Sequence, residues 1–259
     1  MSEILSLALV GGASMVPPVL YLVWVRGWEV CRRESLKDLY KALAIGGTFS
    51  VLLAIMMSTV FNTLFYGLFR IVIPVPMEME ADLGLLISVV LVAPLVEEPA
   101  KLIGLGLMKG KIRELEDGLV YGMATGFGFA LTENIIYGWE ELLYGGLLSG
   151  LALVAFRSAL SSFLHASATA VSGLGLSKWV VTGLSGGRAT LLNAMPYLGA
   201  AIALHATYNS LSSSSILFGP NLAAGILSLM IVPLVYSVLN KIRRMTKDLD
   251  RRFPCIEFQ

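Results

Sequence analysis

Charged residues are scarce in this chain. Aspartate, glutamate, lysine and arginine make up 14% of its 259 residues, whereas a typical soluble domain has about a quarter. Hydrophobic residues make up 56%, and the mean hydropathy is +0.77. Apolar stretches of about 20 residues, long enough to cross a bilayer core of about 30 Å, recur along the sequence. This composition excludes an ordinary soluble domain and predicts a multi-pass protein of the cell membrane, in contact with the lipid bilayer.

The sequence also lacks a strong net charge, a set of cysteines for a disulfide framework and the features of a removable signal peptide. The net charge is only +1, and the basic residues fall in loops, so we expect no nucleic-acid partner. The two cysteines, Cys31 and Cys255, are too few and too far apart to indicate a disulfide framework. The N-terminus has neither a basic n-region nor a small-residue cleavage site, so no removable signal peptide is predicted.

Hydropathy predicts about seven transmembrane helices. No shift in composition marks a domain boundary, so residues 1–259 are expected to form a single integral-membrane domain. Its fold class is an all-α, polytopic transmembrane helix bundle. The expected spans are about 4–25, 42–69, 83–108, 118–138, 147–176, 191–211 and 222–240.

Lysine and arginine predict the orientation of the bundle. They gather in every other connecting segment, within 26–41, 109–113, 178–188 and the basic tail 241–259. Because cytoplasmic loops carry the excess of lysine and arginine, we expect the N-terminus outside and the C-terminus with its tail in the cytosol. The regular alternation also supports seven spans, since one missed span would reverse the pattern downstream.

Glycine spacing predicts where helices approach one another. Gly122 and Gly126 are four residues apart, as are Gly146 and Gly150. Small residues at this spacing let membrane helices pack closely. We therefore expect both pairs to serve packing and not chemistry.

Ionisable side chains inside the spans point to function. Each costs about 2.5–3.5 kcal/mol at the centre of a membrane helix, so such groups are expected to pair with one another around a hydrated cavity. They are Glu97, Glu98 and Lys101 on the third span, Glu133 on the fourth, Arg157 and His165 on the fifth, and His205 on the sixth.

Helical spacing indicates how the third span presents its charges. Glu97 and Lys101 are four residues apart with the acid first, the favoured order for an ion pair on one helix face. Glu98 points about 100° away from Glu97. Pro94 and Pro99 each remove a backbone hydrogen bond, so we expect a kink in this helix.

Each of these groups also has a purely structural interpretation. In this interpretation, Glu97 and Lys101 form a charge-neutral ion pair that only stabilises their own helix. A lone histidine within the membrane makes a hydrogen-bonded contact between helices. Arg157 then neutralises a glutamate, since a guanidinium cannot act as a base. The gathering of three glutamates and two histidines on four helices favours a functional site.

The residue types favour attack of water on an amide. Carboxylate and imidazole together can activate water by general base catalysis. Asn209, one turn after His205, offers an amide donor for an oxyanion. The same glutamates and histidines could instead bind a divalent metal such as zinc and leave one position for water. The HExxH spacing of many zinc peptidases is absent, and no aspartate lies in a span to complete a serine–histidine–aspartate set, so the sequence leaves the cofactor open between a metal and none.

Four motifs carry a family resemblance. EEPAK at 97–101, FALTE at 129–133, a lone His165 and HATYN at 205–209 follow one another on four spans. In this order they resemble the PrsW family of intramembrane proteases, part of the wider group that contains the CAAX prenyl endopeptidases and Abi-type proteins. The resemblance covers residues 83–211, the motif-bearing core. In the CAAX branch the first motif is EExxxR and the second ends in histidine. Lys101 and Glu133 therefore favour PrsW and argue against prenylated substrates.

The resemblance implies a hydrolase that cuts a peptide bond in or near the transmembrane segment of a single-span, anti-sigma-factor-like membrane protein. It leaves the type open between glutamate-dependent and metal-dependent. Glu97 or Glu98 would activate water, Glu133 and His165 would complete the polar cluster, and His205 and Asn209 would bind the oxyanion or hold a metal. Lys101 and Arg157 would support them. The possible metal ligands are Glu97, Glu133, His165 and His205.

Two alternatives to proteolysis remain at this point. An ion- or proton-coupled transporter uses similar intramembrane glutamate, histidine and arginine groups, although the internal repeats of many transporters are not evident here. A non-catalytic binder would keep the same cavity. Counting helix rise places Glu133 about 22 Å from the cytosolic end of its span. We therefore expect the cavity to open toward the outer leaflet.

Overall fold

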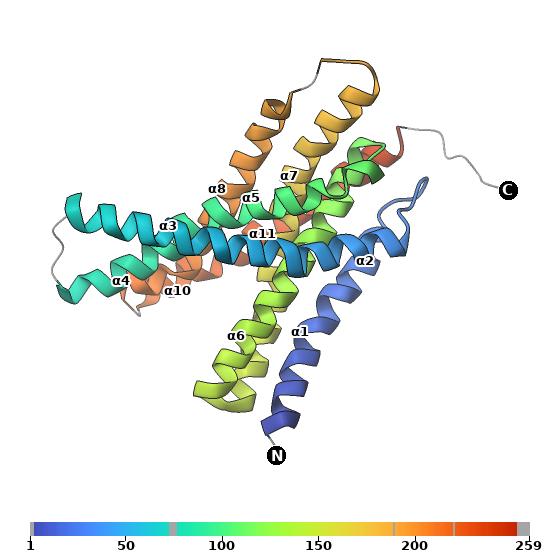
Figure 1. Ribbon diagram of the computed structural model, residues 1–259. Coiled ribbons are helices and arrows are strands. Elements are labelled where there is room, and N and C mark those ends of the chain that lie inside the picture. Colours follow the sequence, from blue (N-terminus) through green and yellow to red (C-terminus); the bar gives the residue numbers. More distant parts are fainter. Residues whose placement is uncertain (1–2, 73–76, 189, 220, 253–259) are drawn as a thin grey trace.

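The computed structural model describes residues 3–72, 77–188, 190–219 and 221–252, and these residues form helices and no strand. Figure 1 shows the helices crossing one another in a single bundle. The α-helices are α1 (Glu3–Arg26), α2 (Leu36–Ile45), α3 (Val51–Val72), α4 (Met77–Ile87), α5 (Ala93–Gly106), α6 (Leu115–Ala159), α7 (Ser161–Leu184), α8 (Met195–Ser212), α9 (Ser214–Phe218), α10 (Leu222–Leu229) and α11 (Ile231–Asp250). Two π-helical turns, η1 (Gly46–Ser50) and η2 (Ser88–Val92), join α2 to α3 and α4 to α5, and η3 (Lys109–Lys111) and η4 (Leu191–Ala194) are 3₁₀ turns.

The predicted all-helical membrane architecture is confirmed in its coarse form. Five helical segments of the described residues are long and apolar enough to cross a membrane. One of them, Leu115–Leu184, has 70 residues and includes both the fourth and the fifth expected spans. The sixth expected span corresponds to α8, which is not among the five. The other candidates are Glu3–Arg26, Leu36–Leu64, Asp82–Gly106 and Leu222–Asp250.

The 70-residue segment cannot cross a bilayer once, because a helix of that length spans about 105 Å. The chain turns back at Gly146, whose φ of 81° and ψ of 179° are not helical. Only glycine adopts this backbone region without strain. Beyond the turn, Gly150 lies so close to Gly138 that an added Cβ would be 2.9 Å from its carbonyl oxygen. Gly150 thus packs as the spacing predicts, whereas Gly146 makes the reversal, visible at the lower end of α6 in Figure 1.

A glycine stripe on α6 brings this helix against α7. A Cβ added to Gly122 would be 2.6 Å from the carbonyl oxygen of Thr169, and one added to Gly126 would overlap that of His165. The prediction that Gly122 and Gly126 serve close packing is therefore confirmed. Because the contact is backbone to backbone, it fixes His165 of α7 beside the polar residues of α6.

Three connecting segments meet at one end of the bundle, on the right in Figure 1. The carboxylate of Asp250, at the end of α11, accepts hydrogen bonds from the backbone N–H groups of Val30, Cys31 and Arg32 in the α1–α2 loop. Arg32 also forms an ion pair with Glu114, just before α6. The loops after α1 and α5 and the end of α11 therefore share one face.

The tail predicted at 241–259 is in part a packed helix. Residues 241–250 belong to α11, and Ile242, Thr246 and Asp250 on one side of it are buried. The rest of the tail from residue 253, including Cys255, lies outside the described residues. Cys31 is disulfide-bonded, a bridge that the cysteine count did not indicate.

Candidate active site

The polar cluster begins on α5, directly after the π-helical turn η2. The N–H of Ala93 bonds back five residues to the carbonyl of Ser88, the π-helical pattern. The next carbonyl, that of Val89, faces Pro94, which has no N–H to donate. Asn209 of α8 supplies the missing donor, with 2.7 Å between its Nδ2 and the Val89 oxygen. The expected kink thus takes the form of a π-helical turn, a feature often found at functional sites, held by the asparagine of the HATYN motif.

The ammonium group of Lys101 lies at the centre of the cluster and is fully buried. Its Nζ is 2.8 Å from Oε1 of Glu98 and 3.3 Å from Oε2 of Glu97. The same atom is 2.7 Å from Nδ1 of His165 and 4.2 Å from the ring centre of Phe129. The predicted pairing of Glu97 with Lys101 is confirmed, and the lysine contacts Glu98 at a shorter distance.

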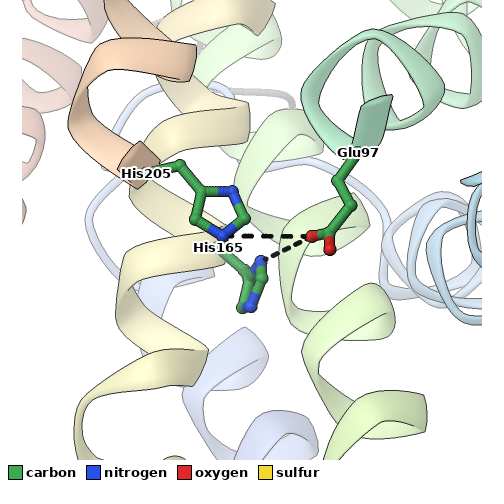
Figure 2. Close-up of side chains that lie close together, drawn as sticks. All are labelled: Glu97, His165 and His205. Atoms are coloured by element: carbon green, nitrogen blue, oxygen red, sulfur yellow. Dashed lines mark ion pairs between the residues drawn. The ribbon is translucent and has the colours of Figure 1, made fainter. Parts of the chain in front are cut away.

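Each histidine has one ring nitrogen against a buried carboxylate. Nδ1 of His205 is 2.8 Å from Oε1 of Glu98, and Nε2 of His165 is 2.9 Å from Oε2 of Glu133. The remaining nitrogens, Nε2 of His205 and Nδ1 of His165, are each 4.0 Å from Oε2 of Glu97. Figure 2 shows the two rings converging on Glu97 from α7 and α8.

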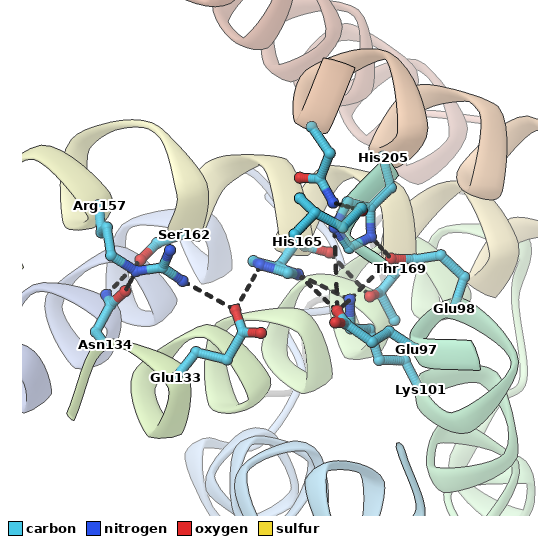
Figure 3. Close-up of polar contacts among 12 residues, drawn as sticks. Glu97, Glu98, Lys101, Glu133, Asn134, Arg157, Ser162, His165, Thr169 and His205 are labelled. Atoms are coloured by element: carbon cyan, nitrogen blue, oxygen red, sulfur yellow. Dashed lines mark hydrogen bonds and ion pairs between the residues drawn. The ribbon is translucent and has the colours of Figure 1, made fainter. Parts of the chain in front are cut away.

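Arg157 extends the cluster on the side of Glu133. Its Nη2 is 3.0 Å from Oε2 of Glu133, and its Nε donates to Oδ1 of Asn134 at 3.0 Å. Asn134 in turn donates to the hydroxyl of Ser162 at 3.2 Å. Figure 3 shows this chain of contacts running from Arg157 to the two histidines. Asn134 and Ser162 were missed in the sequence because they are uncharged, although Asn134 directly follows the FALTE motif.

A cavity of about 500 Å³ opens onto one side of the cluster. Glu97, Glu133, His165 and His205 line it, whereas Glu98 does not and is fully buried. Away from the cluster the lining continues along η2 and the C-terminal part of α8. The further lining residues include Asn62, Ser88, Tyr137, Asn209 and Ser212.

The geometry fits a metal ion in one arrangement. Glu97, His165 and His205 each offer one ligand atom, and these atoms lie within 4.8 Å of one another. Three protein ligands with one position left for water are typical of catalytic zinc sites. Metal-binding histidines usually donate their other N–H to a carboxylate. Glu98 and Glu133 already occupy that place on His205 and His165.

The same arrangement sets two conditions on a metal. Glu133, predicted as a possible ligand, contacts the nitrogen of His165 that faces away from Glu97, so it suits orienting the ring. The ammonium of Lys101 lies 2.7 Å from the inner nitrogen of His165. It must withdraw toward Glu98 before that nitrogen can bind a cation.

Comparison with known proteins agrees with the motifs. A family model described as PrsW family intramembrane metalloprotease matches residues 34–238. No curated protein and no solved structure matches the chain.

Proposed function

Because this chain belongs to the PrsW family of intramembrane metalloproteases, an enzyme family whose substrates are membrane proteins, we propose that it hydrolyses a peptide bond at the cluster around Glu97. The observation that carries the proposal is the convergence of Glu97 Oε2 with one nitrogen of His165 and one of His205, each at 4.0 Å, beside a cavity. The family match favours proteolysis over the transport interpretation.

The position of each carboxylate assigns its role in this proposal. Glu97 is the glutamate of α5 that lines the cavity, so it is the one that meets the attacking water. Glu98 is fully buried between Lys101 and His205, and it orients the imidazole of His205. Glu133 orients His165 in the same way. Lys101 compensates the charge of both glutamates of α5.

A divalent metal such as zinc, when bound, polarises a carbonyl and lowers the pKa of the attacking water. Glu97, His165 and His205 would hold it, each through the atom described above. In a glutamate-type reaction Glu97 itself accepts the proton of the water as general base. For a metal to bind, the inner nitrogens of the two histidines must be free of protons. Their outer N–H groups then donate to Glu98 and Glu133.

We assign Asn209 a positioning role. Its amide N–H₂ donates to the carbonyl of Val89, and it lines the cavity. A contact with an oxyanion would require the second N–H of the same amide. Asn209 therefore stabilises the π-helical turn that precedes Glu97. Binding of an oxyanion would be a second role of the same amide group.

The topology that goes with this function is seven crossings of the cell membrane with the N-terminus outside. The reversal at Gly146 divides the 70-residue candidate into two crossings, and α8 provides another. The basic α1–α2 loop meets the end of α11 on one face, as expected for the cytosolic side. The cavity extends along α8 toward Ser212, away from the basic loop that precedes α8. We thus place its opening toward the outer leaflet, where a single-span, anti-sigma-factor-like substrate would be cut near its external side.

A reporter protein with one transmembrane segment, reconstituted with the enzyme in liposomes, tests the proposal. Replacing Glu97 by Gln keeps the shape and removes the base or ligand, so cleavage is expected to fall by about 10²–10⁴-fold, the usual contribution of a general base. Glu140→Gln, an exposed glutamate of α6, is the matched control and should cleave at the wild-type rate. Wild-type cleavage by Glu97→Gln would overturn the proposal.

Metal analysis of the same preparations separates the two types. About one zinc per chain, lost in His165→Ala together with activity, supports the metal-dependent type. Full activity after treatment with a strong chelator, in protein free of metal, supports the glutamate type.

A further inference from the structure

A second group of carboxylates lies at the end of the bundle where the loops after α1 and α5 meet. Glu29 and Glu34 come from the α1–α2 loop, and Asp117 from the first turn of α6. One oxygen of each lies within 4.8 Å of the others. The backbone holds them in place. The N–H of Glu34 donates to Glu29 at 3.1 Å, and the N–H of Arg113 donates to Asp117 at 2.6 Å.

No lysine or arginine of the described residues forms an ion pair with these three carboxylates. The neighbouring arginines are directed elsewhere. Arg26 donates through Nε to the backbone carbonyl of Glu34, and Arg33 to that of Glu29. In the described structure, no basic side chain is thus in direct ion-pair contact with the group, whereas Lys101 contacts both Glu97 and Glu98.

One oxygen of the group also lacks a partner. Glu29 is 0% exposed, and its Oε1 accepts no hydrogen bond in the described structure. A buried acceptor without a partner costs about 1–3 kcal/mol, more for a charged group, and in native structures such an atom often marks an ion or water. A cavity of about 510 Å³ lies beside the group; Glu34 and Asp117 line it together with Arg32, Arg33 and Arg113, and Glu29 does not.

We propose that Glu29, Glu34 and Asp117 form a binding site for a hard divalent cation, and that this cation is Ca²⁺. All three ligands are carboxylate oxygens, the donors that Ca²⁺ and Mg²⁺ prefer. The three oxygens lie within 4.8 Å of one another, and Ca²⁺ accepts an irregular set of oxygen ligands, whereas Mg²⁺ demands a near-ideal octahedron. The hydroxyl of Tyr121 donates to Oε2 of Glu34 and orients that ligand from behind.

The bound cation would join the α1–α2 loop to the first turn of α6. The same loop is held by Asp250 at the end of α11. Three helices would then be tied together at the end opposite the hairpin of Gly146. Because α6 also carries Glu133, the cation would stabilise the helix that orients His165.

A shared proton is the competing explanation for these close carboxylates. Burial raises the pKa of Glu29 to about 9 and that of Glu34 to about 8, so without a cation both hold protons at neutral pH. A cation must displace those protons, and its affinity should therefore increase with pH.

Terbium luminescence tests the site on the purified full-length protein in detergent. Tb³⁺ occupies calcium sites and emits when energy is transferred from a nearby aromatic ring, and Tyr121 contacts Glu34 directly. We expect saturable emission, about one ion per chain, that Ca²⁺ displaces. Glu34→Gln should weaken Tb³⁺ binding at least about 10-fold, since ligand charge sets the affinity of such sites.

Two controls separate this site from others. Asp38→Asn changes an acid at the same end that pairs with Lys111, and Glu97→Gln changes the membrane cluster; both should bind Tb³⁺ as the wild type does. Absence of saturable emission from the wild-type protein overturns the proposal, whether or not the variants fold. Unchanged binding by a folded Glu34→Gln variant also overturns it, and displacement by Mg²⁺ at lower concentrations than by Ca²⁺ overturns the assignment to calcium.

Discussion

Two groups of three carboxylates, both largely buried, differ in how their charge is balanced. At membrane depth, each carboxylate has a cationic partner at 2.8–3.3 Å. Lys101 contacts Glu97 and Glu98, and Arg157 contacts Glu133. Two histidines lie beside them. At the loop end, Glu29, Glu34 and Asp117 accept hydrogen bonds from backbone N–H groups and one tyrosine. The hydrocarbon core offers no water or free ions, so charges there must be paired by the protein itself. The loop group lies outside the apolar segments, so it can take a proton or an ion from solution.

The largest effect on stability is expected from removing the cation of the membrane cluster. Lys101→Met keeps the apolar stem and deletes the ammonium, which leaves Glu97 and Glu98 buried without their partner. Breaking a buried ion pair in this way typically destabilises a protein by about 3–5 kcal/mol. Thermal and denaturant unfolding in detergent would measure it. Lys109→Met, at an exposed position, should change stability by no more than about 0.5 kcal/mol.

The double variant Lys101→Met/Glu98→Gln is the internal check on this interpretation. If uncompensated charge is the cause, neutralising Glu98 as well should recover part of the loss, with a coupling energy of about 0.5–3 kcal/mol, as for other contacting pairs. Losses that simply add would show that the lysine contributes by packing alone.

A matched pair of Glu→Gln substitutions compares the two groups directly. Glu98→Gln weakens hydrogen bonds to Lys101 and His205 and should destabilise the protein by about 1.5–3 kcal/mol, the usual value for bonds to charged groups. Glu34→Gln, measured with a chelator at pH 8, removes a charge that no cation balances. The free energy of unfolding should then stay the same or increase. Equal losses in both variants would contradict the contrast between the groups.

A further expected effect is a pH dependence to which the raised pKa values of the loop group contribute. Burial raises the pKa of Glu29 to about 9 and that of Glu34 to about 8, whereas the ordinary value is 4.5. Between these values the folded state binds more protons than the unfolded state. Stability should therefore fall as pH rises from about 5 to about 9. The melting temperature, measured with a chelator, should show this slope, and Ca²⁺ or Glu34→Gln should reduce it. A melting temperature independent of pH over this range would be the opposite result.

Much of the membrane cluster could be predicted from the sequence. Glutamate, lysine and histidine are so costly inside apolar helices that their presence alone marks the site, and Lys101 lies one turn after Glu97, as its spacing requires. The neutral members Asn134 and Ser162 gave no such signal, because an uncharged polar side chain costs much less to bury than a charged one. The loop group gave none either, since Glu29, Glu34 and Asp117 are ordinary residues for a loop or helix start.

The sequence by itself determined that the chain is helical and membrane-bound and which charged residues lie within its apolar helices, since these properties follow from hydropathy and residue spacing. Only the tertiary structure decided which nitrogen of each histidine faces Glu97, that Asn209 holds the π-helical turn, and that three loop carboxylates meet. Those facts depend on how closely helices approach, down to the backbone contact of Gly126 with His165. Distances between segments far apart in the chain cannot be obtained from local sequence patterns.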